Sequence, residues 1–347
     1  MALDLRPIFR SFWHGPPLGP YQLLCLRSFA SRATCVEVFS YDPDFVVPEW
    51  VIRRDAREIF PTEKVLRYQT VRFGCGSPAL HANLFRYMML HELGGWWIDL
   101  DVILMQPMLP DDEIFFARQG ELSTRVGNSV LRFPTKHPLI AEAIACSEIV
   151  GENASEWGQT GPILLTELIE RHELAGLCKP YNSAYPIPWF EIDALFDPAR
   201  CNEMRERCSG ATFLHLFNEV WRGSGIPRDL GPPVGSFIDQ LFTEHDIGIR
   251  FKNRMTSDNV VRWIENRNRC IRLEENEHRL LLERAAMEAR LEHLEKERAN
   301  LVASRTAVET RLEGLLASTS WKVTAPLRAF KRVLLGSRRS STLPRID

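Results

Sequence analysis

The chain has 347 residues, of which 45% are hydrophobic, and a formal net charge of -2 at pH 7. A chain of this length and apolar content can bury a large core, with room for one large domain and an appendage. The nearly neutral charge argues against nucleic acid as the main partner, because phosphate binding normally requires a basic surface. The cysteines form no C-x-x-C pair, which disfavours a zinc site.

The opening sequence, MALDLRPIFRSFWHG, lacks the continuous apolar stretch of a secretory signal. No run of the chain approaches the roughly 18 apolar residues of a transmembrane helix. We therefore expect a cytoplasmic protein whose cysteines are reduced thiols.

The first half of the chain alternates helical and strand patterns. Apolar spacing predicts helices over residues 22–31 and 51–59 and strands over 36–40 and 96–104. Such alternation predicts an α/β fold, in which helices cover the faces of a sheet. Ligands of such folds bind at the carboxyl ends of the strands.

A helix is predicted over residues 78–93, with Ser77 as its N-cap and Gly94 as its stop. The helical spacing places Asn83 and Arg86 on one face. That face is expected to point toward the strand that follows the Gly-Gly turn.

Two carboxylates, Asp99 and Asp101, stand in the apolar run that follows this turn. Burying them is costly unless a positive group meets them, so they suggest a divalent cation; a solvated strand edge is the alternative. Arg86 lies about 12 Å back from the turn along the helix and Asp99 about 13 Å forward along the strand. Arg86 should therefore lie beside the two aspartates, either with a functional role or as a structural counter-ion.

Residues 83–101 resemble the DxD sugar-transferase family that includes initiating mannosyltransferases and capsular-polysaccharide glycosyltransferases, and more distantly resemble glucosylating toxins. The resemblance runs from about residue 9 to about residue 242 and rests also on other blocks in the family's order: FWHG at 12–15, SYDP at 40–43, DAREIFP at 55–61, TGP at 160–162 and HLFNEVW at 215–221. It implies a GT-A-type, Rossmann-like nucleotide-sugar-binding domain.

The resemblance also implies roles for individual residues. Asp101 would bind Mn²⁺ or Mg²⁺ directly, and Asp99 would contact ribose or sugar and help to hold the ion. Arg86 and Asn83 would orient the donor sugar. Asn83 departs from the family, which usually has an aspartate there, so it can still form hydrogen bonds but supplies no charge. Trp13 would stack on the nucleotide base, or else serve only as core packing.

The block at 215–221 follows a predicted strand over 212–217. The resemblance implies that His215, Asn218 and Trp221 contact the diphosphate or the metal; the alternative for His215 is a structural role in the strand. The TGP block precedes a helical pattern over 163–171 and either faces the acceptor or simply starts that helix.

The composition changes at about residue 253, and we predict three parts: a glycosyltransferase domain over 1–250, a helical segment over 251–317 and a tail over 318–347. Apolar residues recur every seven positions in the second part, at Leu273, Leu280, Met287, Leu294, Leu301, Val308 and Leu315. Arginines interrupt the companion row, at Arg284, Arg298 and Arg305. The pattern fits a weak coiled coil, through which the chain would form a homo-oligomer, or a helix docked on the domain.

The tail is basic and contains aromatic residues. Residues 319–347 carry seven Lys or Arg against one Asp, a local charge of +6. The tail resembles an ending frequent in bacterial cell-surface polysaccharide transferases. It could bind the inner face of a membrane peripherally, or it could be a solubilising tail.

Together these features predict a metal-dependent hexosyltransferase that moves a sugar from a nucleotide-diphospho-sugar to a saccharide or lipid-linked acceptor. The resemblance implies retention of the anomeric configuration and a place in cell-surface polysaccharide synthesis. Two other classes of protein fit parts of the sequence. An aspartate-type phosphohydrolase would use Asp99 as nucleophile, but the later lysine and distal acidic pair are lacking. A non-catalytic scaffold would use the coiled-coil segment alone.

Overall fold

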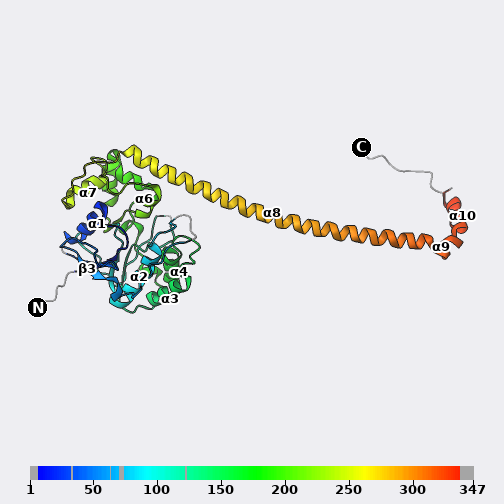
Figure 1. Cartoon of the computed structure of the whole chain (residues 1–347), viewed down its shortest axis with the longest axis horizontal. Coiled ribbons are helices and arrows are strands. Elements are labelled where there is room, and N and C mark those ends of the chain that lie inside the picture. Colours follow the sequence, from blue (N-terminus) through cyan, green and yellow to red (C-terminus); the bar gives the residue numbers. More distant parts are fainter. Residues whose placement is uncertain (1–6, 33, 63, 70–73, 122, 337–347) are drawn as a thin grey trace. The chain divides into compact units, whose positions relative to one another are not determined.

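The computed structural model describes residues 7–32, 34–62, 64–69, 74–121 and 123–336 (Figure 1). The chain divides into two compact units, Met1–Ile271 and Arg272–Asp347. The first unit contains both sheets, and the second is helical in its described part.

The central sheet of the first unit is mainly parallel. Its strands run in the order β3-β2-β1-β4-β6, with the bounds β1 Ile8–Phe12, β2 Cys35–Ser40, β3 Ile52–Asp55, β4 Gly95–Ile98 and β6 Val130–Phe133. β6 alone runs antiparallel to its neighbour within this sheet. A small antiparallel sheet pairs β5 (Val102–Leu104) with β7 (Phe213–His215). The predicted α/β class is confirmed.

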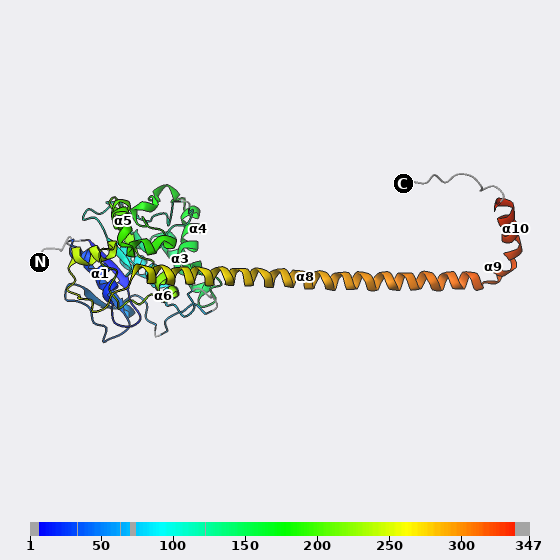
Figure 2. The ribbon, with the colours of Figure 1, turned by 90° about the horizontal axis from the view of Figure 1, so that it is seen from above.

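Helices cover both faces of the central sheet, as Figures 1 and 2 show. The helices of the first unit are α1 Pro20–Ala30, α2 Ala79–Leu93, α3 Pro138–Val150, α4 Leu164–Arg171, α5 Cys201–Cys208, α6 Asn218–Ser224 and α7 Phe237–His245. One core lies between the sheet and α1, α5 and α7, and a second lies between the sheet and α2, α3 and α4. Two layers of helices therefore enclose the sheet, as expected for an α/β fold.

The two tryptophans of β4 belong to different cores. Trp96 stacks on Phe9 in the first core, with 5.3 Å between ring centroids, whereas Trp97 belongs to the second. Alternation along a strand sends successive side chains to opposite faces, so a strand buried on both faces is apolar throughout. The turn into β4 needs glycine, because Gly94 has φ +60° and an added Cβ would lie 2.8 Å from the Thr135 nitrogen.

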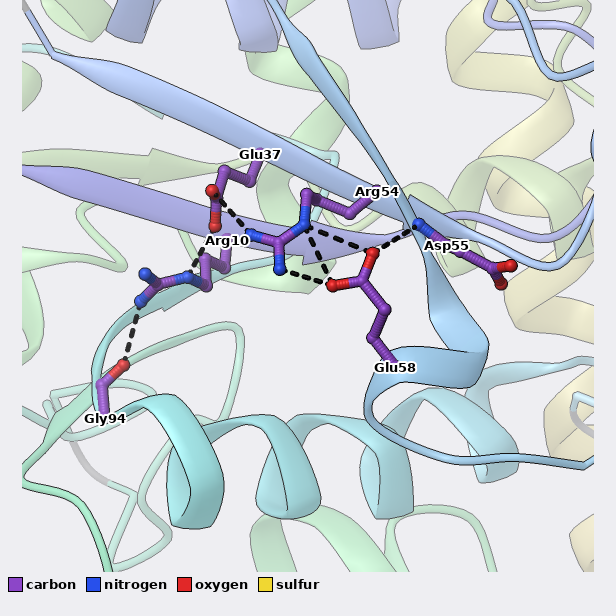
Figure 3. A network of polar contacts seen from close by, with 6 residues as sticks. All are labelled: Arg10, Glu37, Arg54, Asp55, Glu58 and Gly94. Carbon is purple, nitrogen blue, oxygen red and sulfur yellow. Dashed lines mark hydrogen bonds and ion pairs between the residues drawn. The ribbon is translucent and has the colours of Figure 1, made fainter.

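A chain of ion pairs, here called the sheet network, crosses neighbouring strands (Figure 3). Glu37 on β2 accepts from Arg10 on β1 at 2.7 Å and from Arg54 on β3 at 2.9 Å. Arg54 also pairs with Glu58, and Arg10 donates to the carbonyl of Gly94 at 3.1 Å. The network therefore joins the edge strand β3 to the turn that leads into β4.

Two secondary-structure predictions were wrong. Residues 51–59 do not form a helix; they form β3 and a short 3-10 turn, because pairing with β2 outweighs local helical spacing. Residues 96–104 do not form one strand. The chain leaves the central sheet after Ile98 and turns at Asp99–Asp101, and β5 then pairs with β7.

The helix α8 spans Ser257–Ala317. Its first residues belong to the first unit, where Val260 and Ile264 are buried in the core. The contact boundary therefore falls after Ile271 rather than after residue 250.

Within the second unit, the predicted heptad residues from Leu273 to Leu315 are exposed. Two short helices follow, α9 (Thr319–Val323) and α10 (Ala325–Gly336). Residues 337–347 of the basic tail lie outside the described residues. Among the described residues, no helix is both long enough and apolar enough to cross a bilayer.

Candidate functional site

A cleft of about 840 Å³ opens in the first unit beside the carboxyl ends of β1 and β4. It brings together most of the predicted site residues: Trp13, Asn83, Arg86, Asp99, Asp101, His215 and Asn218. They come from parts of the chain as distant as β1 and α6, so the fold assembles them in one place.

Asp99 follows β4 directly, and its backbone N–H donates to the Ser129 carbonyl at 2.8 Å. Its Oδ1 accepts from Arg86 Nη2 at 2.6 Å and from Trp97 Nε1 at 2.8 Å. Arg86 is buried, and its guanidinium lies over the Trp97 ring, 5.0 Å from the centroid. The contact expected between Arg86 and Asp99 from helix and strand spacing is confirmed.

Burial raises the pKa of Asp99 above its ordinary value, and the neighbouring charge of Asp101 adds to the shift, although Arg86 opposes it. Asp99 and Asp101 offer carboxylate oxygens within 4.8 Å of each other. Two carboxylates this close disfavour each other's ionised form. A cation between them would therefore stabilise the charged form of both.

Asp101 is held by the segment that follows β7. Its Oδ2 accepts from the backbone N–H of Asn218 at 2.7 Å and lies 3.2 Å from His215 Nε2. Its carbonyl accepts from the Leu216 N–H at 2.8 Å. Burial raises the pKa of this carboxyl, but the attraction and hydrogen bond of His215 outweigh burial, so the net shift is downward.

The segment between β7 and α6, which holds Asp101, contains a residue in the left-handed region, Phe217, with φ 50° and ψ 53°. That conformation is unfavourable for a residue with a bulky side chain, and such strain gathers at functional sites. The strained turn directs the Asn218 N–H at Asp101, and the Phe217 ring packs on His215 with centroids 4.1 Å apart. Local sequence preferences could not predict this contact.

The side chains of Asp99, Asp101 and His215 each place a ligand atom within 4.8 Å of the others. Two carboxylates suit hard cations such as Mg²⁺, and an added imidazole is compatible with Mn²⁺. Donors from other residues converge on Oδ1 of Asp99 and Oδ2 of Asp101. The donor set therefore fits a divalent cation bound through the remaining carboxylate oxygens.

Asn83 lies at the centre of a buried amide network. Its Oδ1 accepts from Arg86 Nη1 at 2.8 Å and from Asn128 Nδ2 at 3.0 Å, while its Nδ2 donates to Thr160 Oγ1 at 3.3 Å. Gly161 leaves room for both amides, since an added Cβ would lie 2.8 Å from Asn128 Nδ2. Thr160 is buried, so of its two predicted roles the structure favours the start of a helix over contact with an acceptor.

Trp13 lines the cleft but is also anchored. Its Nε1 donates to the Pro16 carbonyl at 2.8 Å, and its backbone N–H donates to Phe39. The ring is partly buried against the first core. This geometry leaves both predicted roles, stacking and packing, compatible with the structure.

Trp221 does not line this cleft, which corrects the prediction that it contacts substrate directly. It is 1% exposed and packs edge-on against Tyr21 and Phe196, with ring centroids 4.8 and 4.9 Å away. The helix α6 turns this side chain into the core while its first residue, Asn218, stays at the cleft.

Several cleft residues were missed in the sequence: Arg67, Asn128, Trp189 and Arg228. Asn128 precedes the strand β6, and a polar residue at a strand terminus is a usable signal. The others lie in loops or short turns, where local sequence does not show which residues face a shared cleft.

Comparison with known protein families gives one match. Residues 34–119 match the family described as "Glycosyltransferase sugar-binding region containing DXD motif". None of the curated proteins matches the chain. A solved structure titled "PaToxG Glycosyltransferase" is 15% identical, with a TM-score of 0.37, over 59% of this chain and 78% of that chain.

The matched region covers β2 to the turn after β5, and so includes Asn83, Arg86 and both aspartates of the cleft. Residues 34–119 of the chain therefore match the sugar-binding region of DXD-containing glycosyltransferases.

Proposed function

We propose that the chain transfers a hexosyl group from a nucleotide-diphospho-sugar to a saccharide or lipid-linked acceptor, with Mn²⁺ or Mg²⁺ as cofactor. The observation that carries this proposal is the cluster of Asp99, Asp101 and His215 in the same cleft as the buried Arg86. The family match supplies the reaction class, glycosyl transfer.

Asp99 and Asp101 would hold the cation, with His215 either as a third ligand or as the donor that orients Asp101. A bound cation would act as a Lewis acid and stabilise the charge that develops on the departing diphosphate. The Asn218 N–H and the carbonyl bond to Leu216 hold Asp101 in one orientation before substrate binds.

The remaining residues would position the donor. Arg86 is fixed by Asp99 and Asn83, so its guanidinium is held rigidly at the cleft. Because the guanidinium of Arg86 is already held in place, it needs little reorganisation when charge develops nearby. Asn83 contributes amide hydrogen bonds without charge, and Trp13 offers an aromatic face for a nucleotide base.

The test is donor turnover by the full chain with a panel of UDP- and GDP-hexoses. We expect release of nucleoside diphosphate that needs Mn²⁺ or Mg²⁺ and stops with EDTA. Turnover that persists unchanged in EDTA would contradict the metal role. Hydrolysis of p-nitrophenyl phosphate without donor turnover would instead favour the phosphohydrolase.

The anomeric outcome is part of the proposal. The resemblance to retaining transferases supports retention. NMR identifies the anomer of the glycoside formed, or of the hexose released by donor hydrolysis before its anomers equilibrate. A product with inverted configuration would contradict it. A role in cell-surface polysaccharide synthesis further requires that acceptors from such a pathway be better substrates than water.

The tail and α8 support two further parts of the proposal. Trp321, Phe330 and nearby basic residues would bring a cytoplasmic enzyme to an anionic membrane surface. Truncation after Leu316 should then reduce cosedimentation with anionic liposomes, and salt should weaken binding of the full chain. Equal cosedimentation of both proteins at low salt would contradict the membrane role.

Self-association would bury the exposed heptad residues of α8 between two copies. We expect a dimer in sedimentation equilibrium that becomes a monomer when Leu294 and Leu301 are changed to Ser. A monomer at all concentrations would contradict self-association.

A further inference from the structure

The cleft contains more positive than negative side chains. Among the described residues, six arginines line it: Arg67, Arg86, Arg125, Arg222, Arg228 and Arg267. Three carboxylates line it in the same part of the chain: Asp99, Asp101 and Glu219. The cleft therefore has a surplus of positive charge before any ligand binds.

The ion pairs show where this surplus lies. Arg86 pairs with Asp99, and Arg222 pairs with Glu219. In the described part of the chain, no ion pair joins Arg67, Arg125 or Arg228 to a carboxylate. Arg67 binds the Gly76 carbonyl and His14, and Arg228 binds the Asn218 side chain at 3.3 Å.

The donor alone does not neutralise this surplus. A nucleotide-diphospho-sugar and a divalent cation carry opposite charges that roughly cancel, so the filled donor site keeps the excess of positive charge. A cleft with a net positive charge concentrates anionic ligands. The remaining ligand of the reaction is the acceptor.

The same cleft has an exposed aromatic surface. Trp189 is 43% exposed and lines the cleft. Its ring packs edge-on against Phe190, with centroids 5.6 Å apart, and lies over the Arg267 guanidinium at 5.7 Å. An indole held in this way presents an apolar face on which the C–H face of a sugar ring can pack.

We propose that the acceptor is an anionic saccharide, one that bears a carboxylate or phosphate, and that it packs on Trp189 while the surplus arginines attract its charge. This inference rests on the proposed glycosyltransferase function and adds the substrate class of its acceptor. Arg125 and Arg228 are the cations whose removal tests it, because neither forms an ion pair with a carboxylate in the described residues.

The experiment uses the full chain with Mn²⁺ and UDP or GDP on an array of acidic saccharides and their neutral counterparts. We expect binding to acidic saccharides, which salt weakens. A preference for neutral saccharides, or no binding to any acidic one, overturns the inference. If the wild type binds no nucleoside diphosphate with Mn²⁺, the proposed function itself fails.

The best acidic ligand and its neutral analogue, for example a uronate and its methyl ester, are then titrated. Arg125→Gln and Arg228→Gln should each reduce the preference for the acid by about fivefold. Arg125 is exposed and serves as the variant that is safe for folding. Trp189→Ala should weaken acid and ester by about tenfold alike.

Leu177→Ala is the control, because Leu177 is a large exposed apolar residue that does not line the cleft. We expect wild-type affinity for both ligands. If Trp189→Ala behaves like this control, or if both arginine variants keep the full preference for the acid, the acceptor site lies elsewhere and the inference is wrong.

Discussion

Two charge networks lie at opposite ends of β4, one at Gly94 and one at Asp99, and they differ in what their carboxylate oxygens contact. In the sheet network, each carboxylate oxygen of Glu37 accepts from a different arginine, Arg10 or Arg54. In the cleft network, here Arg86, Asp99, Asp101 and His215, donors converge on one oxygen of each aspartate. The first network is complete by itself, whereas the second has carboxylate oxygens available to a cation.

This difference predicts different consequences for similar changes. A network that satisfies all of its own charges can contribute to stability alone, because no group is available for a ligand. A network that holds two carboxylates close together costs stability, and a cation that binds between them offsets that cost. Substitutions in each network separate the two effects.

The largest effect is expected from Asp101→Asn. The amide can still accept from His215 and the Asn218 N–H, but it loses the charge that holds the cation. We expect donor turnover to fall at least about 100-fold, while thermal unfolding without metal stays close to wild type. Wild-type turnover with normal dependence on Mn²⁺ would rule out Asp101 as a ligand.

Arg86→Ala should affect both activity and stability. Its removal leaves Asp99 without its cationic partner and Asn83 Oδ1 with one donor, Asn128, instead of two. We expect kcat/KM to fall about 100-fold and the free energy of unfolding to fall by about 2–4 kcal/mol. Kinetics equal to wild type, measured on folded protein, would make Arg86 only a structural counter-ion.

Glu37→Gln tests the sheet network. The change leaves Arg10 and Arg54 with no carboxylate between them. The free energy of unfolding should fall by about 2–3 kcal/mol, measured by urea titration. Donor KM and kcat should remain at wild-type values at a temperature where the variant is folded. A large loss of kcat would mean that the two networks are coupled.

Acid should destabilise the protein through His81, which is fully buried. Burial lowers the pKa of His81 to about 4 from an ordinary 6.5. Its Nδ1 accepts from the Leu66 N–H, so Nε2 carries the proton toward the Tyr41 hydroxyl. The folded state therefore requires the neutral ring.

Because the folded pKa is the lower one, the unfolded state binds the proton first as pH falls. The stabilisation is complete above pH 6.5 and is lost progressively down to about pH 4. The loss approaches about 3 kcal/mol. Urea unfolding at pH 7 and pH 5 measures it, and His81→Gln should flatten this pH dependence. An equally steep dependence in the variant would assign the effect to other groups.

The smallest effect is expected from Trp13→Ala. If its ring stacks on the base, affinity for the nucleoside diphosphate should fall by about 1–2 kcal/mol. Calorimetry with a folded variant measures this directly. Equal affinity would mean that Trp13 serves only the core.

The cleft network was partly predictable from the sequence. The helix ends and the strand begins at the turn that contains Gly94. The two distances from this turn, along the helix to Arg86 and along the strand to Asp99, are nearly equal, so the two residues are expected side by side. The contacts of His215 and Asn218 with Asp101 depend on long-range pairing of β5 with β7 and on a strained turn at Phe217, which local patterns do not encode.

The fold shows the same limit. The α/β class follows from the alternating helical and strand patterns. The short, charged edge strand β3 has helical spacing in its sequence, and only its pairing with β2 shows that it is a strand. The prediction that Trp221 contacts substrate was wrong for a related reason. A motif identifies a residue but does not show whether its side chain points into the cleft or into the core. The family match over residues 34–119 supports glycosyl transfer as the reaction class.

The most direct test of the central claim is calorimetric titration of UDP and GDP into the full chain, with and without Mn²⁺. The claim is that the cleft aspartates bind a cation that in turn binds the donor diphosphate. We expect Mn²⁺-dependent binding in the wild type and in Glu37→Gln, and its loss in Asp101→Asn. Nucleotide binding that is independent of Mn²⁺, or that is equally strong in Asp101→Asn, would contradict the claim.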